Sequence, residues 1–99
     1  MEKVKYFKQH IESWNQVRTI YGCYSDKDVM PEGDVSCKVR EVLQDERKEH
    51  IKTEVYMDFI EPDEVTFITK KKYFQAIRVF NNAEKLYCKA DELLKTLMV

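Results

Sequence analysis

Residues 69–98 read TKKKYFQAIRVFNNAEKLYCKADELLKTLM, and this stretch has the strongest periodicity in the chain. Apolar side chains recur at every seventh position in two neighbouring columns. Separations of three and four residues between such columns are typical of a helix with one buried stripe. Thr69 can cap the first turn, and no Pro or Gly interrupts the run. The pattern predicts one long helix over about 70–98.

The predicted helix is longer than a small domain can cover. About 28 residues at ~1.5 Å each span about 42 Å, whereas a domain of 99 residues has a diameter of roughly 33 Å. Alanine at every seventh position also lets another backbone approach closely. We therefore predict a homodimer whose self-association or partner face consists of Tyr73, Ala76, Phe80, Ala83, Tyr87, Ala90, Leu94 and Leu97. Packing of the same face on the chain's own sheet, or on a target, is the alternative.

The first residues of the chain show a second helical pattern. Apolar side chains recur at spacings of three and four residues, at Val4, Phe7, Ile11 and Trp14. This spacing predicts a first helix over about 2–18, in which Trp14 packs in the core against the alanine column. An exposed contact residue is the alternative for Trp14, because tryptophan is enriched at binding hot spots.

Alternation of apolar and polar residues predicts three strands in the middle of the chain. The pattern is clearest over 50–60, where Ile51, Val55 and Phe59 alternate with polar neighbours. Residues 64–69 return after Pro62 as a second strand and form a hairpin with 50–60. A strand is favoured over 35–43, although the sequence up to residue 49 also suits a helix. Residues 19–34 read as irregular, with a short strand over 19–24 as an alternative.

These elements predict a single α+β domain of residues 1–99. One sheet face must be covered and two amphipathic helices are available, so both helices are expected on one face of a three- or four-stranded antiparallel meander. The other face is expected to be wet and acidic, with Glu54, Tyr56 and Asp58. A hydrophobic content of 43%, with two Gly and two Pro, favours a folded domain over a disordered chain.

Charge is unevenly distributed along the chain. Residues 69–99 carry a net charge of +4 and residues 19–68 one of −7. Lys70, Lys71 and Lys72 open the predicted long helix, where cations oppose the helix dipole and a phosphate would relieve the conflict. Together with Arg78 they are the candidate contact for an anion or a nucleic acid.

The predicted order α-β-β-β-α, with lysines at the start of the last helix, resembles the double-stranded-RNA-binding domain at the level of topology. The resemblance implies RNA as a partner. The chain lacks the family's Gly-Pro-x-His loop and has an acidic middle segment, so we assign no family.

The sequence contains no arrangement that points to catalysis or to a cofactor. His10 and His50 lie in separate predicted elements, and no glycine-bearing elbow or phosphate loop accompanies Cys37 or any serine. No CxxC, HxxxH or calcium-loop spacing is present. We therefore expect no enzyme activity, no catalytic or metal-binding residues, no cofactor and no small-molecule substrate.

Three widely spaced cysteines, an odd number, fit reduced thiols in the cytoplasm. No apolar run approaches 18 residues, which is close to the minimum for a membrane span, and the first residues do not resemble a signal peptide. The leading hypothesis is a small intracellular adaptor, regulator or inhibitor of another macromolecule. Compact proteins without motifs of this kind are common in phage and mobile-element genomes. The alternative hypothesis is a nucleic-acid-binding module that uses Lys70–Lys72.

Overall fold

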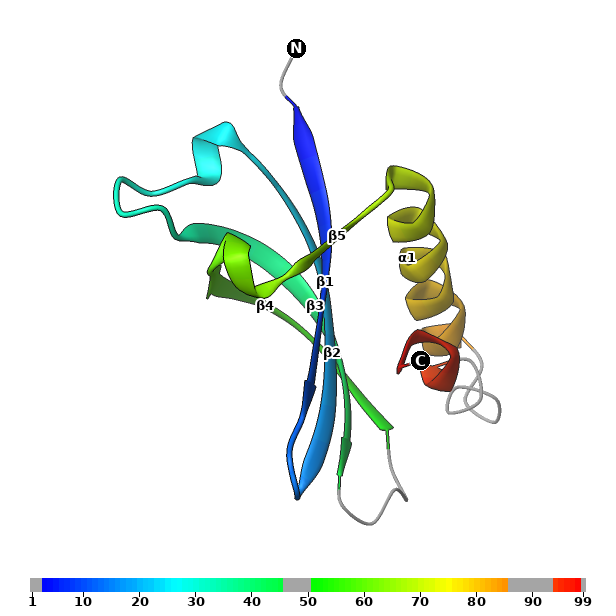
Figure 1. Ribbon diagram of the computed structural model, residues 1–99. Helices are drawn as coiled ribbons and strands as arrows, with labels where there is room; N and C mark the ends of the chain where they lie inside the picture. Colours follow the sequence, from blue (N-terminus) through cyan, green and yellow to red (C-terminus); the bar gives the residue numbers. More distant parts are fainter. Residues whose placement is uncertain (1–2, 46–50, 86–93, 99) are drawn as a thin grey trace.

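The computed structural model describes residues 3–45, 51–85 and 94–98. Over these residues, the chain forms a five-stranded antiparallel sheet with a single α-helix, α1, on one of its faces (Figure 1). The elements are β1 (Val4–Glu12), β2 (Gln16–Ser25), η1 (Asp26–Asp28), β3 (Val35–Asp45), β4 (Ile51–Ile60), η2 (Pro62–Glu64), β5 (Thr66–Ile68), α1 (Lys70–Lys85) and η3 (Thr96–Met98).

The strand order is β4-β3-β2-β1-β5. The first four strands form a meander, and the chain then crosses through η2 to the opposite edge, where Phe67 pairs with Phe7 of β1. The predicted hairpin between 50–60 and 64–69 is therefore wrong. Both segments are strands, but they lie at opposite edges of the sheet, because β5 gains a ladder with β1 that no local pattern shows.

The predicted first helix is also wrong. Residues 4–12 form β1, and a short turn leads directly into β2, so that Glu12 pairs with Val17. The helical spacing of Val4, Phe7 and Ile11 is outweighed by pairing with β2 on one side and β5 on the other. Trp14 is not in the core: it lies in the turn and its exposed fraction is 88%.

Gly22 of β2 allows β1 and β2 to pack as they do. Phe7 lies opposite Gly22 in the ladder and is fully buried. A Cβ atom at position 22 would overlap the Phe7 ring. Glycine is therefore required at position 22, because the Phe7 ring approaches the β2 backbone closely there. Phe7 is the largest fully buried residue of the core.

The sheet has a hydrophobic cluster on each face. Ile20 joins Phe7, Tyr24, Val35 and Val39 on the face away from α1. The next residue, Tyr21, joins a second cluster beneath the helix, which also contains Val42, Ala76, Phe80, Ala83, Leu94 and Leu97. Because successive residues of a strand point to opposite faces, β2 contributes to both clusters. Figure 1 shows α1 on one side of the sheet and η2 on the other.

The predicted continuous helix to residue 98 is wrong. The helix α1 runs from Lys70 to Lys85, and residues 94–98 return to the sheet, where the Tyr21 hydroxyl donates a hydrogen bond of 3.0 Å to the Leu97 carbonyl. Leu94 and Leu97 are thus buried within the chain and do not extend past the domain. In the described part of the chain, one α-helix on five strands replaces the expected two helices on a three- or four-stranded meander.

The remaining segments agree in part with the expectations. The strand favoured over 35–43 is β3. The irregular reading of residues 19–34 is wrong at its start, because residues 19–25 belong to β2, which contains the short strand considered over 19–24. Residues 46–50, for which the sequence suits either a strand or a helix, lie outside the described part. Among the described residues, no helix combines the length and the apolar character needed to cross a membrane.

Candidate functional site

The face predicted for self-association is covered by the chain's own sheet. Ala76, Phe80 and Ala83 are at most 6% exposed and pack with Tyr21 and Val42. Leu94 and Leu97 complete the same buried cluster. Tyr73 is half-buried and stacks at a tilt on Tyr6 of β1, with ring centroids 5.0 Å apart. The two remaining residues of the predicted face, Tyr87 and Ala90, lie outside the described residues.

The lysines predicted to contact anions are exposed at the start of α1. The Lys72 amide donates to the Thr69 hydroxyl at 3.2 Å, which is the cap expected from the sequence. The fold brings lysines of β1 close to them: Lys5 and Lys70 line a hollow of about 460 Å³ together with Tyr6 and Phe67. The sequence could not connect these lysines, because their proximity depends on the crossover to β5.

We call Lys5, Lys8, Lys70, Lys71 and Lys72 the basic surface. Two aromatic rings close to these lysines are each 49% exposed: Phe67, and Phe74, which follows Lys72 by two residues in α1. The Lys5 ammonium lies 5.8 Å from the centre of the Phe67 ring. Arg78 is exposed further along α1 and lines neither of the two hollows described here.

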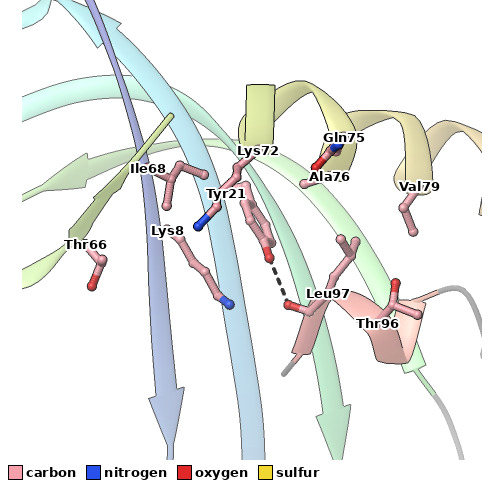
Figure 2. A pocket seen from close by; sticks show the side chains of 10 residues that line it. All are labelled: Lys8, Tyr21, Thr66, Ile68, Lys72, Gln75, Ala76, Val79, Thr96 and Leu97. Atoms are coloured by element: carbon pink, nitrogen blue, oxygen red, sulfur yellow. Dashed lines mark hydrogen bonds between the residues drawn. The ribbon is translucent and has the colours of Figure 1, made fainter. Parts of the chain in front are cut away.

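A second hollow, of about 490 Å³, lies between the sheet, α1 and η3. Figure 2 shows Lys8 from β1 and Lys72 from α1 reaching toward Tyr21, while Ala76, Val79 and Leu97 supply apolar walls. The Lys8 ammonium lies 5.8 Å from the centre of the Tyr21 ring. Burial raises the pKa of the Tyr21 phenol, so this hydroxyl stays protonated and donates to Leu97 at neutral pH.

A buried ionic network crosses the other face of the sheet. Glu41 of β3 is 3% exposed and accepts hydrogen bonds from Arg18 of β2, at 2.6 and 3.0 Å, and from the Tyr56 hydroxyl of β4, at 2.7 Å. Burial and the bond to Glu41 raise the pKa of Tyr56 to about 12. Its hydroxyl is therefore a donor, and the Glu41 charge is balanced by Arg18. The network connects β2, β3 and β4. Because the Glu41 carboxylate is buried and already bonded to Arg18 and Tyr56, we assign Glu41 no catalytic role.

The strand β4 forms an open edge of the sheet with an apolar side. It pairs with β3 in an unbroken register from Val35↔Ile60 to Gln44↔Ile51, and no other described strand pairs with it. Val55, Met57 and Phe59 are 47%, 65% and 67% exposed. We call these three residues the β4 apolar stripe.

The sequence predicted the opposite burial for the two faces of this strand. Alternation placed Val55 and Phe59 toward the core and Tyr56 on a wet face. In the structure Tyr56 is half-buried and Ile60 is buried, whereas the stripe lies on the helix face of the sheet but is exposed. Period-two alternation identifies two faces but not which one is covered, and α1 lies over β1 and β2 rather than over β4.

His10 and Cys37 have structural surroundings that do not activate a nucleophile. His10 contacts Thr19 at 2.9 Å and Glu12 at 3.1 Å, all within β1 and β2. Cys37 is buried, and burial raises the pKa of its thiol to about 11, which disfavours the thiolate. His50, the other histidine considered with Cys37, lies outside these residues. Within residues 3–45, 51–85 and 94–98, no group of three or more His, Cys, Asp or Glu side chains has a metal-binding arrangement.

Comparisons of the chain with family models, with curated proteins and with solved structures found no match.

Proposed function

We propose that this protein is a non-enzymatic interaction protein, an adaptor, regulator or inhibitor, and that the open edge of β4 is its contact surface. The observation that carries the proposal is the exposure of Val55, Met57 and Phe59 on an edge strand. Natural edge strands are usually protected by charged side chains, by proline or by bulges, and the charges of β4 lie only on the face opposite the stripe, at Lys52, Glu54 and Asp58. The apolar stripe carries no charge, and the register with β3 has no bulge.

The proposed mode of binding is addition of an extended segment to the sheet. Such binding combines main-chain hydrogen bonds along the edge with side-chain contacts at alternate positions. Covering exposed apolar surface contributes about 25 cal/mol per Å². The stripe therefore supplies the apolar part of the contact. The backbone groups of β4 that face the open edge supply hydrogen bonds, which align the bound segment along the strand.

Site-specific photo-crosslinking tests this proposal. A photoreactive amino acid replaces Met57 on the stripe or, as a control, Asn82, which is exposed on α1. In cells that produce the protein, we expect covalent adducts from position 57 and not from position 82. Adding Val55→Lys to the position-57 variant should abolish them. Equal adducts from both positions, or none from position 57, would refute the β4 edge as the contact surface.

A second candidate function is binding of single-stranded nucleic acid by the basic surface. Proteins that bind single strands combine cationic side chains, which contact the phosphate backbone, with exposed aromatic rings, on which the bases stack. The basic surface has such rings nearby in Phe67 and Phe74. Fluorescence anisotropy with a labelled oligonucleotide tests it. Binding should weaken steeply with added salt and be lost in the triple variant Lys70→Glu, Lys71→Glu, Lys72→Glu. No binding at low salt removes this candidate.

We further propose that the protein acts inside the cell. Cys23 and Cys37 both carry free thiols, and free thiols persist in a reducing compartment. To check this location, cells that produce the protein are fractionated, and a thiol-reactive label reports whether its cysteines are reduced.

A further inference from the structure

The backbone of β4 shows which of its groups face the open edge. The Phe59 amide donates to its neighbour's carboxylate, Asp58 Oδ1, at 2.8 Å. This amide therefore points away from β3. Because backbone groups of an antiparallel strand alternate in direction, those of Val55 and Met57 also point to the free edge. The edge offers hydrogen bonds at the same residues that carry the apolar stripe.

We infer that the partner of this edge is a second copy of the chain, paired antiparallel through β4 about a two-fold axis beside Val55. The inference rests on the proposed function, because it uses the same edge, and it names the occupant. The observation that supports it is that, in one register, the side chains of two antiparallel copies of β4 are complementary in charge and in apolar character.

The pleat and the charges select that register. Val42 packs beneath α1 and pairs with Thr53, so odd-numbered residues of β4 share the helix face and even-numbered residues share the other. When both copies present the same face of the sheet, each residue must lie opposite a residue whose side chain is on that same face. The two-fold axis then passes beside one residue, which lies opposite its own copy. Only a few such centres leave most of β4 paired.

Two of these centres bring like charges together. An axis beside Glu54 places that residue opposite itself, and an axis beside Tyr56 places Glu54 opposite Asp58. Like charges directly opposite destabilise a strand pair. An axis beside Met57 leaves Lys52 opposite Pro62, beyond the strand, and forms no pair of opposite charges.

The axis beside Val55 satisfies both faces. On the even face, Lys52 lies opposite Asp58, and symmetry makes this pair twice. On the helix face, Val55 lies opposite itself, Met57 opposite Thr53 and Phe59 opposite Ile51, with no charge among them. Cross-strand pairs of these kinds stabilise a sheet. In this register the Phe59 amide donates to the Ile51 carbonyl of the second copy, which releases the Asp58 carboxylate for Lys52.

Charge reversal and its rescue test the inference in solution. By sedimentation velocity at about 100 µM, we expect the wild type to be a dimer. Lys52→Glu and Asp58→Lys should each weaken the dimer about tenfold, because two attractive pairs become repulsive. The double variant should recover wild-type affinity to within a few-fold. Thermal unfolding followed by circular dichroism checks that all variants remain folded.

Disulfide trapping gives an independent test of the register. Val55→Cys places two thiols beside the axis, at a separation of about 5.5 Å between Cα atoms, within the range that a disulfide spans. Thr53→Cys is the matched control, since it lies opposite Met57. Wild type run in parallel reports any linkage through the native cysteines. Linkage from position 55 and not from position 53 supports the register.

The outcomes separate this inference from the proposed function. A wild type that is monomeric at about 100 µM overturns self-pairing, whereas the proposed function stands or falls on adducts from position 57. A dimer that ignores Lys52→Glu and Asp58→Lys, or one that the double variant does not restore, overturns pairing through β4 in this register.

Discussion

The Tyr21 hydroxyl donates a hydrogen bond of 3.0 Å to the Leu97 carbonyl, and these residues are 76 positions apart in the chain. This contact joins the C-terminal segment to the second strand of the sheet. It explains why Leu94 and Leu97, which continue the apolar columns of α1, are buried without any second molecule. It also forms one wall of the hollow lined by Lys8 and Lys72.

Tyr21→Phe should destabilise the protein by about 1 kcal/mol, because the ring still fills its place but the buried Leu97 carbonyl loses its donor. Urea unfolding measures the change. Hydrogen exchange of residues 94–98 should accelerate more than that of β1, since the lost bond holds this segment to the sheet. Equal acceleration everywhere would mean that the bond contributes only to global stability.

Gly22→Ala should cost about 2–4 kcal/mol, because the added methyl group overlaps the Phe7 ring in a fully packed region. Gly33→Ala is the matched control. Position 33 has open space around it but a φ of 100°, so its cost of about 1 kcal/mol is one of backbone conformation alone. The free energies of unfolding of both variants, from urea titration, test the contrast. Equal losses would contradict it.

Arg18→Met should cost about 3 kcal/mol, because it leaves the Glu41 carboxylate buried without its counter-charge. The double variant Arg18→Met, Glu41→Gln should be more stable than Arg18→Met alone, since the buried charge is gone. A double-mutant cycle of unfolding free energies measures the coupling. Additive losses would show that the two side chains act independently.

Stability should fall as the pH rises from about 10 to about 12. Tyr56 has its pKa raised to about 12 in the folded chain. The folded state therefore keeps the phenol proton that the unfolded chain loses near the ordinary tyrosine pKa of 10.0. The contribution is complete below the lower value and disappears through the higher one. Tyr56→Phe should reduce this dependence in urea titrations across the range. A residual slope should remain, because the pKa values of Tyr21, Tyr24, Cys37 and Tyr73 are also raised.

Ala83→Glu should destabilise the chain by about 3 kcal/mol, because it forces a carboxylate between α1 and the sheet. The neighbouring exposed position provides the control: Asn82→Glu should change stability by less than about 0.5 kcal/mol. An Ala83→Glu variant with wild-type stability but a changed oligomeric state would instead place Ala83 at an interface between copies.

Local patterns located several elements of this fold correctly. The alternation over 50–60 and 35–43 coincides with β4 and β3, and Thr69 caps α1 as its position predicted. Strand alternation and helix caps depend on near neighbours in the chain, so they are readable from the sequence. The basic opening of α1 was readable for the same reason, although its lysine neighbours on β1 were not.

The errors arose where distant residues decide the outcome. The spacing of Val4, Phe7 and Ile11 suits a helix. The strand β1 is stabilised instead by pairing with β2 and β5 and by the packing of Phe7 against Gly22. The apolar columns after residue 85 suited a longer helix, but Leu94 and Leu97 are buried by returning to Tyr21. In each case a non-local contact outweighs a local preference worth less than about 1 kcal/mol per residue.

By itself, the sequence determined the presence of a folded domain with an amphipathic helix after residue 69, two alternating strands before it and a basic cluster at the helix start. Only the tertiary structure decided which faces are covered. The helix lies over β1 and β2, so the alanine column is buried and Val55, Met57 and Phe59 are exposed. The physical reason is that periodicity marks an apolar face, while strand order and helix placement determine whether that face meets the core or solvent.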